Sequence, residues 1–439
     1  SQIEARLLDT KNTGWALNNL RVDAHSAADI ISAAVAGGGS ANATVMAVAA
    51  TNIIQTQALA HVGSGAQVVA QNNVGISARN VDSILGTAAV VAGSGNAAVS
   101  GIGTVNVVET RTRAYIDGAT TAVSALAKNA ADTLLIDSGN LVNAPGSDHQ
   151  WISGDQFNPR PDLAIAQHSV TGLAVQASSV QQVGQLAISA SIAVIPLYSG
   201  AVSGVLNTTV LAGDTLGYID AARINGASGA GTGQNVRVGA DSYSYTAGYL
   251  AAIAGGPSAA AVSGALDSTV ITRTTRAYLR GTTLNSRGAT RVEAGSQAYG
   301  STLVASFSGA IVGVGGTSSV LVLKGETEAL VDGGSSLQVG SLAVDASASQ
   351  HLSPNAATAA AGGVAVGGSL VTLYNQSVTR AWVGTSLDAA AVASGARTSV
   401  RGGAVTINAS NRTGVLLNVA SAGGGPVAVG GSVAISVIE

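Results

Sequence analysis

The stretch Thr112-Arg113-Ala114-Tyr115-Ile116-Asp117-Gly118 decides the fold class, because recognisable copies of it return along the chain. Threonine, alanine and isoleucine alternate in it with arginine, tyrosine and aspartate. Side chains two positions apart lie on the same face of a β-strand, so this alternation predicts a strand with one buried face. The shared pattern is Thr-x-Ala-aromatic-aliphatic. Its copies lie at residues 275–279, 327–331 and 379–383, with weaker ones at 3–5, 56–58 and 215–219.

The alanine position of this first anchor sets the length of the repeat. It falls at residues 5, 58, 114, 217, 277, 329 and 381. A second anchor reads aliphatic-x-Ala, with a polar residue or glycine in the middle. Its copies lie at residues 22–24, 76–78, 175–177, 238–240, 292–294, 344–346 and 407–409. The two anchors predict an all-β unit of about 52–60 residues, present about seven times.

Segments rich in glycine, alanine and valine separate the two anchors, as in residues 362–369 and 427–432. Each glycine inside a helix costs about 1 kcal/mol, so these segments are not helical. β-type runs flank the Gly-Gly pairs, and this arrangement predicts strand, tight corner and strand. We therefore expect two or three coils of chain within each unit.

Small residues dominate the composition. The 439 residues include 57 glycines but only two phenylalanines and one methionine, and 10% are charged, against about 25% in a typical domain. Small side chains suit a narrow interior between closely spaced strands. A β-unit that cannot bury its own face must stack on its copies, so we predict a β-solenoid. The alternative is a string of tandem β-sandwich domains.

One segment interrupts the repeat. We divide the chain into solenoid repeats at residues 1–124, an inserted protruding loop at 125–165, and solenoid repeats again at 166–439. The insertion contains Asp148, His149, Trp151 and Asp155 close together. An aromatic ring beside carboxylates can stack on a sugar or help to hold calcium, so these four are candidate binding residues. The alternative is a self-packed loop with Trp151 as its small core.

A second candidate surface follows from the first anchor. Charged Arg113 and Asp117 must face water, so Tyr115 between them does too, and the same logic exposes Tyr278 and Trp382. Stacked coils would align these rings, together with Tyr218, beside Arg113, Arg276 and Arg380. The stripe is either a binding surface for glycans or lateral filaments, or a ladder that shields the strand backbone.

Several function classes find no support in the sequence. A net charge of −3 gives no footprint for nucleic acid, and no apolar run of about 18 residues predicts membrane insertion. The five histidines have no metal-ligand spacing and the acids are scattered, so we expect neither an enzyme nor a resident cofactor. The absence of cysteine suits export through an oxidising compartment.

The two ends of the sequence fall in register with the repeat. Ser369 and Thr317 each lie 12 residues before an anchor alanine. Ser432 lies seven residues before Glu439, and the first five residues of the chain complete the count of 12. We therefore expect either one period of a tandem array or a subunit that stacks head to tail on copies of itself.

The repeats resemble those of very large filamentous adhesins of Gram-negative bacteria, particularly the leukotoxin-type filamentous adhesins. Residues 112–118, residues 275–279 and the Val-Ala-Val-Gly-Gly-Ser segments carry the resemblance. It implies secretion, display on the cell surface and cell adhesion, and it supplies no catalytic residues. We expect a shaft segment of a secreted surface filament. The alternatives are a self-stacking matrix or sheath fibre, and a β-helix polysaccharide lyase.

Overall fold

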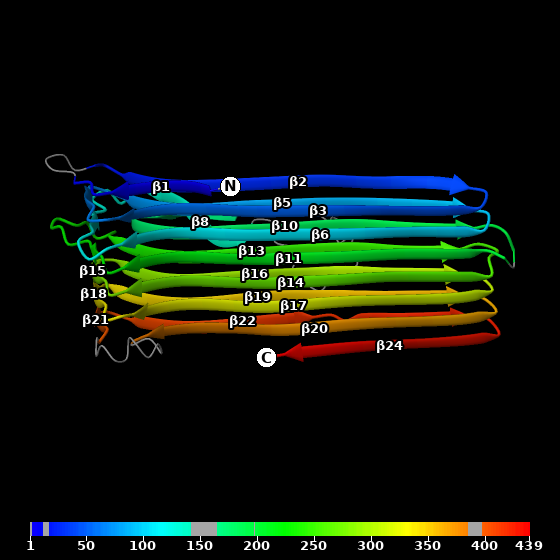
Figure 1. Cartoon of the computed structure of the whole chain (residues 1–439). Coiled ribbons are helices and arrows are strands. Elements are labelled where there is room, and N and C mark those ends of the chain that lie inside the picture. Colours follow the sequence, from blue (N-terminus) through cyan, green and yellow to red (C-terminus); the bar gives the residue numbers. More distant parts are fainter. Residues whose placement is uncertain (1, 12–16, 142–164, 197, 385–396) are drawn as a thin grey trace.

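The chain winds into a β-solenoid (Figure 1). The computed structural model describes residues 2–11, 17–141, 165–196, 198–384 and 397–439. Every regular element in these ranges is a β-strand, and they contain no helix long and apolar enough to span a membrane. Each coil has two long strands that run in opposite directions and one short strand that closes the coil. Successive coils pair in parallel, which confirms the predicted solenoid.

Three parallel sheets run through the stack. Sheet A contains, in spatial order, β1 (Gln2–Leu8), β3 (Ala43–Gly63), β6 (Ala97–Asp117), β11 (Gly200–Asp220), β14 (Ala260–Arg280), β17 (Val312–Asp332), β20 (Val364–Val383) and β24 (Val427–Ile438). Sheet C contains β2 (Leu20–Ser40), β5 (Val74–Ser94), β10 (Gly172–Ala193), β13 (Asn235–Gly255), β16 (Ala289–Gly309) and β19 (Ser341–Ala361), which pairs with both β22 (Val405–Val415) and β23 (Asn418–Gly424). Sheet B contains the short strands β4 (Gln67–Ala70), β7 (Ala122–Ala125), β12 (Arg223–Ile224), β15 (Thr283–Asn285), β18 (Ser336–Val339) and β21 (Ser399–Gly402).

Each repeat is one coil, so the expectation of two or three coils per unit is wrong. The complete long strands have 20–22 residues each, and two of them use most of a 52-residue unit. The error came from the glycine pairs. Gly362 and Gly363 do form the corner between β19 and β20, whereas Gly367 and Gly368 lie inside β20. At the corner, a Cβ on Gly362 would lie 2.0 Å from the carbonyl oxygen of Ala310 in the next coil.

In the structure, equivalent residues of successive coils pair with one another and form straight columns along the stack, and each anchor corresponds to such columns. The aliphatic residues of the second anchor form one column of sheet C: Val22, Ile76, Val175, Val238, Val292, Val344 and Ile407. The alanine column of the first anchor contains Ala60 rather than Ala58, because Ala60 pairs with Ala114 and Ala58 pairs with Thr112. Both alanines face the interior, and a slip of two residues preserves the alternation, so the pattern alone could not separate them.

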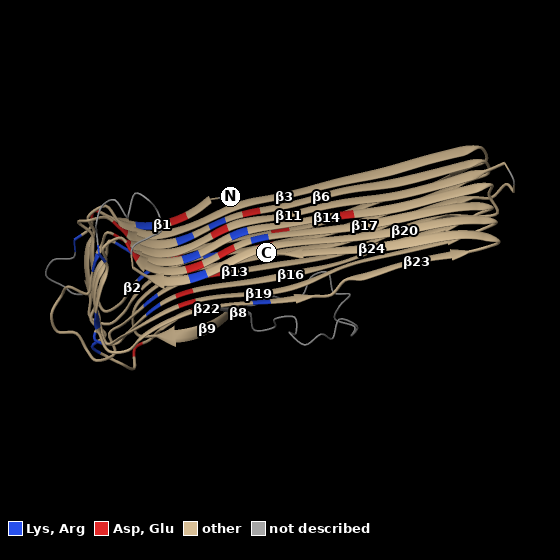
Figure 2. Cartoon of the chain, turned by 90° about the horizontal axis from the view of Figure 1, so that it is seen from below, with Lys and Arg blue, Asp and Glu red and all other residues tan. Residues whose placement is uncertain are grey.

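The interior narrows from one end of the coil to the other (Figure 2). At the wide end, where sheet B joins sheets A and C, the core contains large side chains such as Ile76, Ile116 and Leu284. At the closed end, where the chain turns directly from sheet C into sheet A, the buried apolar side chains are small, and partly buried Met46 packs against them. They are Ala92, Ala98, Ala193, Ala201, Ala254 and Ala261. Core side-chain volume therefore follows the taper of the cross-section.

The ends of the insertion lie against sheet C. Strands β8 (Leu134–Leu141) and β9 (Ile165–Val170) form an antiparallel pair, and Leu134 and Ile136 pack with Ala174 of β10. In sheet C, the column of residues that lies under β8 contains Gly75 of β5 and Ala174 of β10. The same column has arginine in three other coils, at residues 21, 237 and 291. Small residues therefore stand where β8 needs room.

Candidate functional site on the outer face of sheet A

An aromatic ladder crosses sheet A near the wide end of the coils. Tyr115, Tyr218 and Tyr278 lie in one column and point outward, with His61 above them. Their ring centroids are 4.7, 4.7 and 4.6 Å apart from His61 to Tyr278, and successive planes differ by 5°, 3° and 4°. The parallel register alone produces this stacking, since equivalent side chains of adjacent strands are one strand spacing apart.

Each ring in the ladder covers the face of its neighbour. A sugar ring stacks on an aromatic face, so the central rings present only their edges to a ligand. Burial raises the pKa of the Tyr278 phenol to about 12, and it also raises the pKa of Tyr218. These phenols remain neutral at physiological pH. The faces of the central rings are therefore occupied by neighbouring rings and do not form a stacking platform.

The column continues past Tyr278 with a break. Leu330 follows Tyr278, and Trp382 follows Leu330. Leu330 is buried, whereas Trp382 is half-buried. The predicted stripe of Tyr115, Tyr278 and Trp382 is thus one column, in which an aliphatic residue separates the tryptophan from the tyrosines.

Two of the arginines beside the ladder, Arg276 and Arg380, form ion pairs with glutamates. Arg276 and Arg380 lie in one column with Glu328 between them. The Arg276 Nε atom is 2.6 Å and the Arg380 Nη1 atom 3.1 Å from the Glu328 carboxylate, which is buried. Arg276 also contacts Glu326 at 2.8 Å. The sequence pattern predicted the arginine stripe but missed these glutamates, although Glu328 stands in the anchor at the position of Arg276.

The candidate residues of the insertion, Asp148, His149, Trp151 and Asp155, lie outside the described residues. A polar cleft adjoins β8, however, between that strand and strands β2 and β5. Arg79 lies at its edge, 3.8 Å from the buried carboxylate of Asp137, and Asp23 pairs with Arg21 there. The described residues contain no group of three or more metal-ligating side chains, in this cleft or elsewhere.

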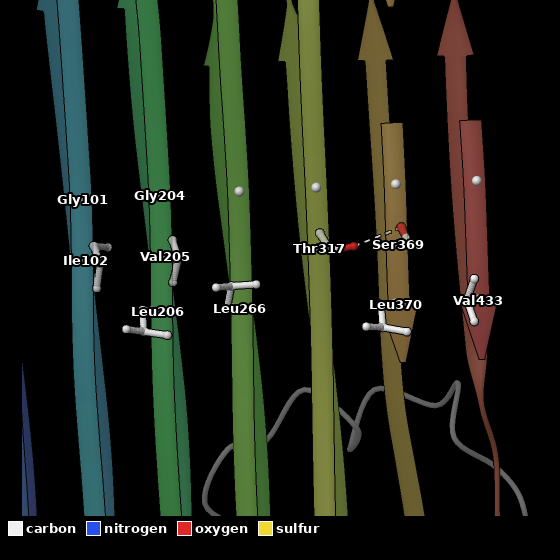
Figure 3. Close-up of a pocket in the computed structure, with 14 residues that line it drawn as sticks. Gly101, Ile102, Gly204, Val205, Leu206, Leu266, Thr317, Ser369, Leu370 and Val433 are labelled. Atoms are coloured by element: carbon white, nitrogen blue, oxygen red, sulfur yellow. Dashed lines mark hydrogen bonds between the residues drawn. The ribbon is translucent and has the colours of Figure 1, made fainter. Parts of the chain in front are cut away.

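A groove near the closed end is the feature that the sequence patterns missed. Six glycines occupy one column of the outer face of sheet A: Gly101, Gly204, Gly264, Gly316, Gly368 and Gly431. They form the floor of an open, apolar groove of about 910 Å³, with Leu206, Leu266 and Leu370 along one side (Figure 3). Gly101, Gly204 and Gly264 stand singly in the sequence, whereas the other three belong to Gly-Gly pairs that the sequence patterns assign to corners. The groove therefore becomes visible only through the register of the coils.

Comparison with known proteins finds no similar family, curated protein or solved structure.

Proposed function

We propose that the chain is a structural shaft segment of a secreted, adhesin-like surface filament. The observation that supports this is the continuity of the sheets, which run in register through every coil without a domain break. Such a stack supplies a stiff body of repeating surface rather than an enclosed site. The absence of cysteine and the resemblance of residues 112–118 and 275–279 to filamentous adhesins support export to the cell surface.

We propose further that other coils of the same kind extend the stack at both ends. β1 pairs only with Gln57–Gly63 of β3, and β24 pairs only with Val364–Asn375 of β20. Traced through the register of sheet A, Gln2 lies in the column of Val378, so β1 and β24 cover different parts of a long strand. The rest of each edge keeps unpaired backbone groups that a further coil would satisfy.

A tandem protein tests this proposal. Two copies joined directly from Glu439 to Ser1 should form one rigid body of unchanged width and about twice the height, visible by electron microscopy. One extra alanine at the junction is the matched control, because a one-residue slip turns the apolar face of the strand outward. Two particles hinged at variable angles in the direct fusion would refute the extended stack.

The same coils also fit a second function, a matrix or sheath fibre in which this chain is the material itself. The edges of sheets A and C favour it, since they can template pairing with a separate copy. Concentration-dependent growth of the single chain into long fibres would favour this fibre. A shaft segment would remain short at the same concentration.

Recognition of a glycan, a calcium ion or a neighbouring filament is proposed to reside in residues 142–164, which contain Trp151 and its acidic neighbours. Replacing this segment with a short glycine-serine linker should leave the circular dichroism of the solenoid unchanged while removing binding in a glycan array. Trp151→Ala alone should reproduce most of that loss. Retained binding in both variants would assign recognition to another surface.

A further inference from the structure

The outer face of sheet A is apolar and exposed at the closed end of the coils. Two residues before the glycine column lies a column of seven valines, here called the valine rail: Val45, Val99, Val202, Val262, Val314, Val366 and Val429. Val45 and Val429 are 73% and 59% exposed, and even Val262, inside the stack, is 43% exposed. Large exposed apolar patches of this kind mark interaction surfaces.

The fold of this chain does not require the glycines beside the valine rail. A Cβ atom added to Gly101, Gly204, Gly316 or Gly431 would meet no described atom within 4 Å. None of the six glycines has a positive φ angle. Glycine in a strand interior weakens the strand, and it marks places where another backbone or a ligand approaches closely. A groove that the chain does not need for its own packing therefore points to an external occupant.

Charge is excluded from this end of the molecule. Every coil contains a long segment without lysine, arginine, aspartate or glutamate: residues 30–54, 83–108, 172–213, 242–266, 294–323, 346–379 and 413–438. These segments form the closed end, whereas the charged residues gather toward sheet B (Figure 2). An occupant of the groove consequently meets apolar side chains and no ionic partner.

We propose that the occupant is a second copy of this chain, packed face to face through sheet A. A two-fold axis parallel to the stack, midway between the valine rail and the glycine groove, places each rail in the groove of the other copy. The coils then lie at equal heights, so Val262 of one copy faces Gly264 of the other. Both copies have the same strand spacing of about 4.8 Å between coils, which an unrelated ligand would have to match along six coils.

The columns on either side fit the same axis. The axis passes at residue 203 of β11 and residue 263 of β14, and residues three positions before it face residues three positions after it. Leu206 of one copy thus faces Gly200 of the other, and Leu266 faces Ala260. In β17 the order reverses, and Ser318 faces Val312. A large residue therefore opposes a small one in β11, β14 and β17. In β20 and β24 two apolar side chains meet instead, Leu370 on Val364 and Val433 on Val427. An axis along the strands would instead set valine on valine and glycine on glycine, leaving the groove empty.

The contact has the size of a stable interface. The overlap is about seven residues wide and seven strands high, because β1 does not extend to this end of sheet A. It measures about 23 Å by 28 Å, which gives about 650 Å² per copy. Specific interfaces bury about 600–1,000 Å² per partner. The charged ends of the two copies point in opposite directions from this overlap, so no like charges meet. The outer face of sheet C is also apolar, but its corresponding column mixes Gly37, Val91, Ala190, Ile253 and Phe307 and offers no continuous groove.

Filling the groove tests the proposal. In Gly264→Val/Gly316→Val, the added side chains point outward into open space, so the fold should melt at the same or a higher temperature by circular dichroism. The surface stays apolar, but the valine rail of the second copy no longer fits. Analytical ultracentrifugation of the 439-residue chain should show a micromolar dimer, weakened at least about tenfold in this variant. Thr272→Val/Gln376→Val is the matched control, because it adds two outward valines outside the overlap, and it should dimerise normally.

Two outcomes would overturn the pairing: a wild-type chain that stays monomeric at about 200 µM, well above the micromolar range expected for this area, or a filled-groove variant that dimerises as tightly as the wild type. This test of the face-to-face dimer does not depend on whether copies also stack end to end. An isologous pair closes at the dimer, whereas stacking at the edges grows without limit, so the two associations differ in the size of their products.

Discussion

Burying a charged side chain in the narrow interior of this solenoid is unfavourable, and the effect shows in the pKa values of the buried carboxyl groups. Asp267 lies between sheets A and C, where it accepts hydrogen bonds from Asn207 at 2.7 Å and Thr269 at 3.2 Å. Burial raises its pKa from 3.8 to about 6, even though these hydrogen bonds act in the opposite direction. Burial also raises the pKa of Asp82 to about 6 and that of Asp241 to about 7. The folded chain therefore holds these carboxyl groups more readily in their neutral form.

Stability should fall as the pH rises from about 4 to 7. The folded pKa of each group lies above its unfolded value, so folding favours the protonated form and the gain is lost as pH passes the folded pKa. For Asp267 alone the change is about 1–3 kcal/mol. Urea denaturation at pH 5 and pH 8 measures it. In Asp267→Asn the amide oxygen can accept from Asn207 and the amide nitrogen can donate to the Thr269 hydroxyl, and this variant should show a smaller difference between the two pH values. Greater stability at pH 8 would contradict the assignment.

Arg273 is the second buried charge. Its Nη1 atom donates to the carbonyl oxygen of Gln297, but its Nε and Nη2 atoms have no hydrogen-bond partner among the described residues. Burial lowers its pKa to about 9. Gly213 and Gly325 flank it in its column and leave room for the guanidinium.

We expect Arg273→Met to raise the free energy of unfolding by about 1–4 kcal/mol, because methionine fills the space without a buried charge. Arg273→Lys keeps the charge and should give no gain. Thermal and urea denaturation of the three proteins distinguish these results. A loss of stability in Arg273→Met would mean that the guanidinium is stabilised by a partner beyond the described residues.

At the scale of elements, strand length and the width of the interior decide which substitutions each position of a strand tolerates. The closed end contains small inward side chains: the column of Ala254 also contains Ser191 and Ser308, both fully buried. At the wide end, outward position alone does not mean exposure, since Glu328 alternates outward and is nevertheless buried by its two arginines. Tolerance to substitution therefore depends on the column as well as on the face.

Ala254→Leu should destabilise the chain by about 1–3 kcal/mol, because the tightly packed core of small residues at the closed end has no space for a larger side chain. Ala251→Leu, three residues away on β13, is the matched control, since Ala251 points outward and is partly exposed. Its effect should be small. Equal shifts in the urea midpoint of the two variants would reject the inward assignment of Ala254.

The sequence predicted those features that depend on alternation and failed on those that depend on register. Thr112, Ala114 and Ile116 are buried and Tyr115 is not, as the alternation indicates. The glycine pairs misled, because Gly367–Gly368 has the same local appearance as the corner Gly362–Gly363. The glycine groove and the covered faces of the tyrosine rings arise only when coils more than 50 residues apart are placed side by side.

At the scale of the whole molecule, the chain is broader than it is tall. A 21-residue strand spans about 70 Å, whereas the eight strands of sheet A stack to about 33 Å. Each coil of 52–60 residues therefore adds only one strand spacing to the height. A long shaft of this design needs very many coils, from one polypeptide or from many stacked copies.

Inner coils should be protected more strongly than outer ones. Strands β10, β13 and β16 pair on both sides, while β22, β23 and β24 pair on one. In a solenoid, stability is shared between neighbouring coils, so an outer coil can open without the rest. Hydrogen exchange followed by mass spectrometry should show slow exchange in the three inner strands and faster exchange in the outer three. Uniform protection would indicate that the coils open as one unit.

The tapered, flattened coil also sets how a filament made from it would bend. The two long sheets give a cross-section about 70 Å wide and about 20 Å thick. Bending stiffness grows with the cube of the dimension in the plane of bending, so such a body resists edgewise bending about tenfold more than flatwise bending. A filament of these coils would therefore be an anisotropic ribbon that bends easily over its broad face and resists bending in the plane of that face. In the proposed pair the two copies overlap over only about 23 Å of their width, so pairing would give a ribbon about 120 Å wide that still bends most easily over its broad face.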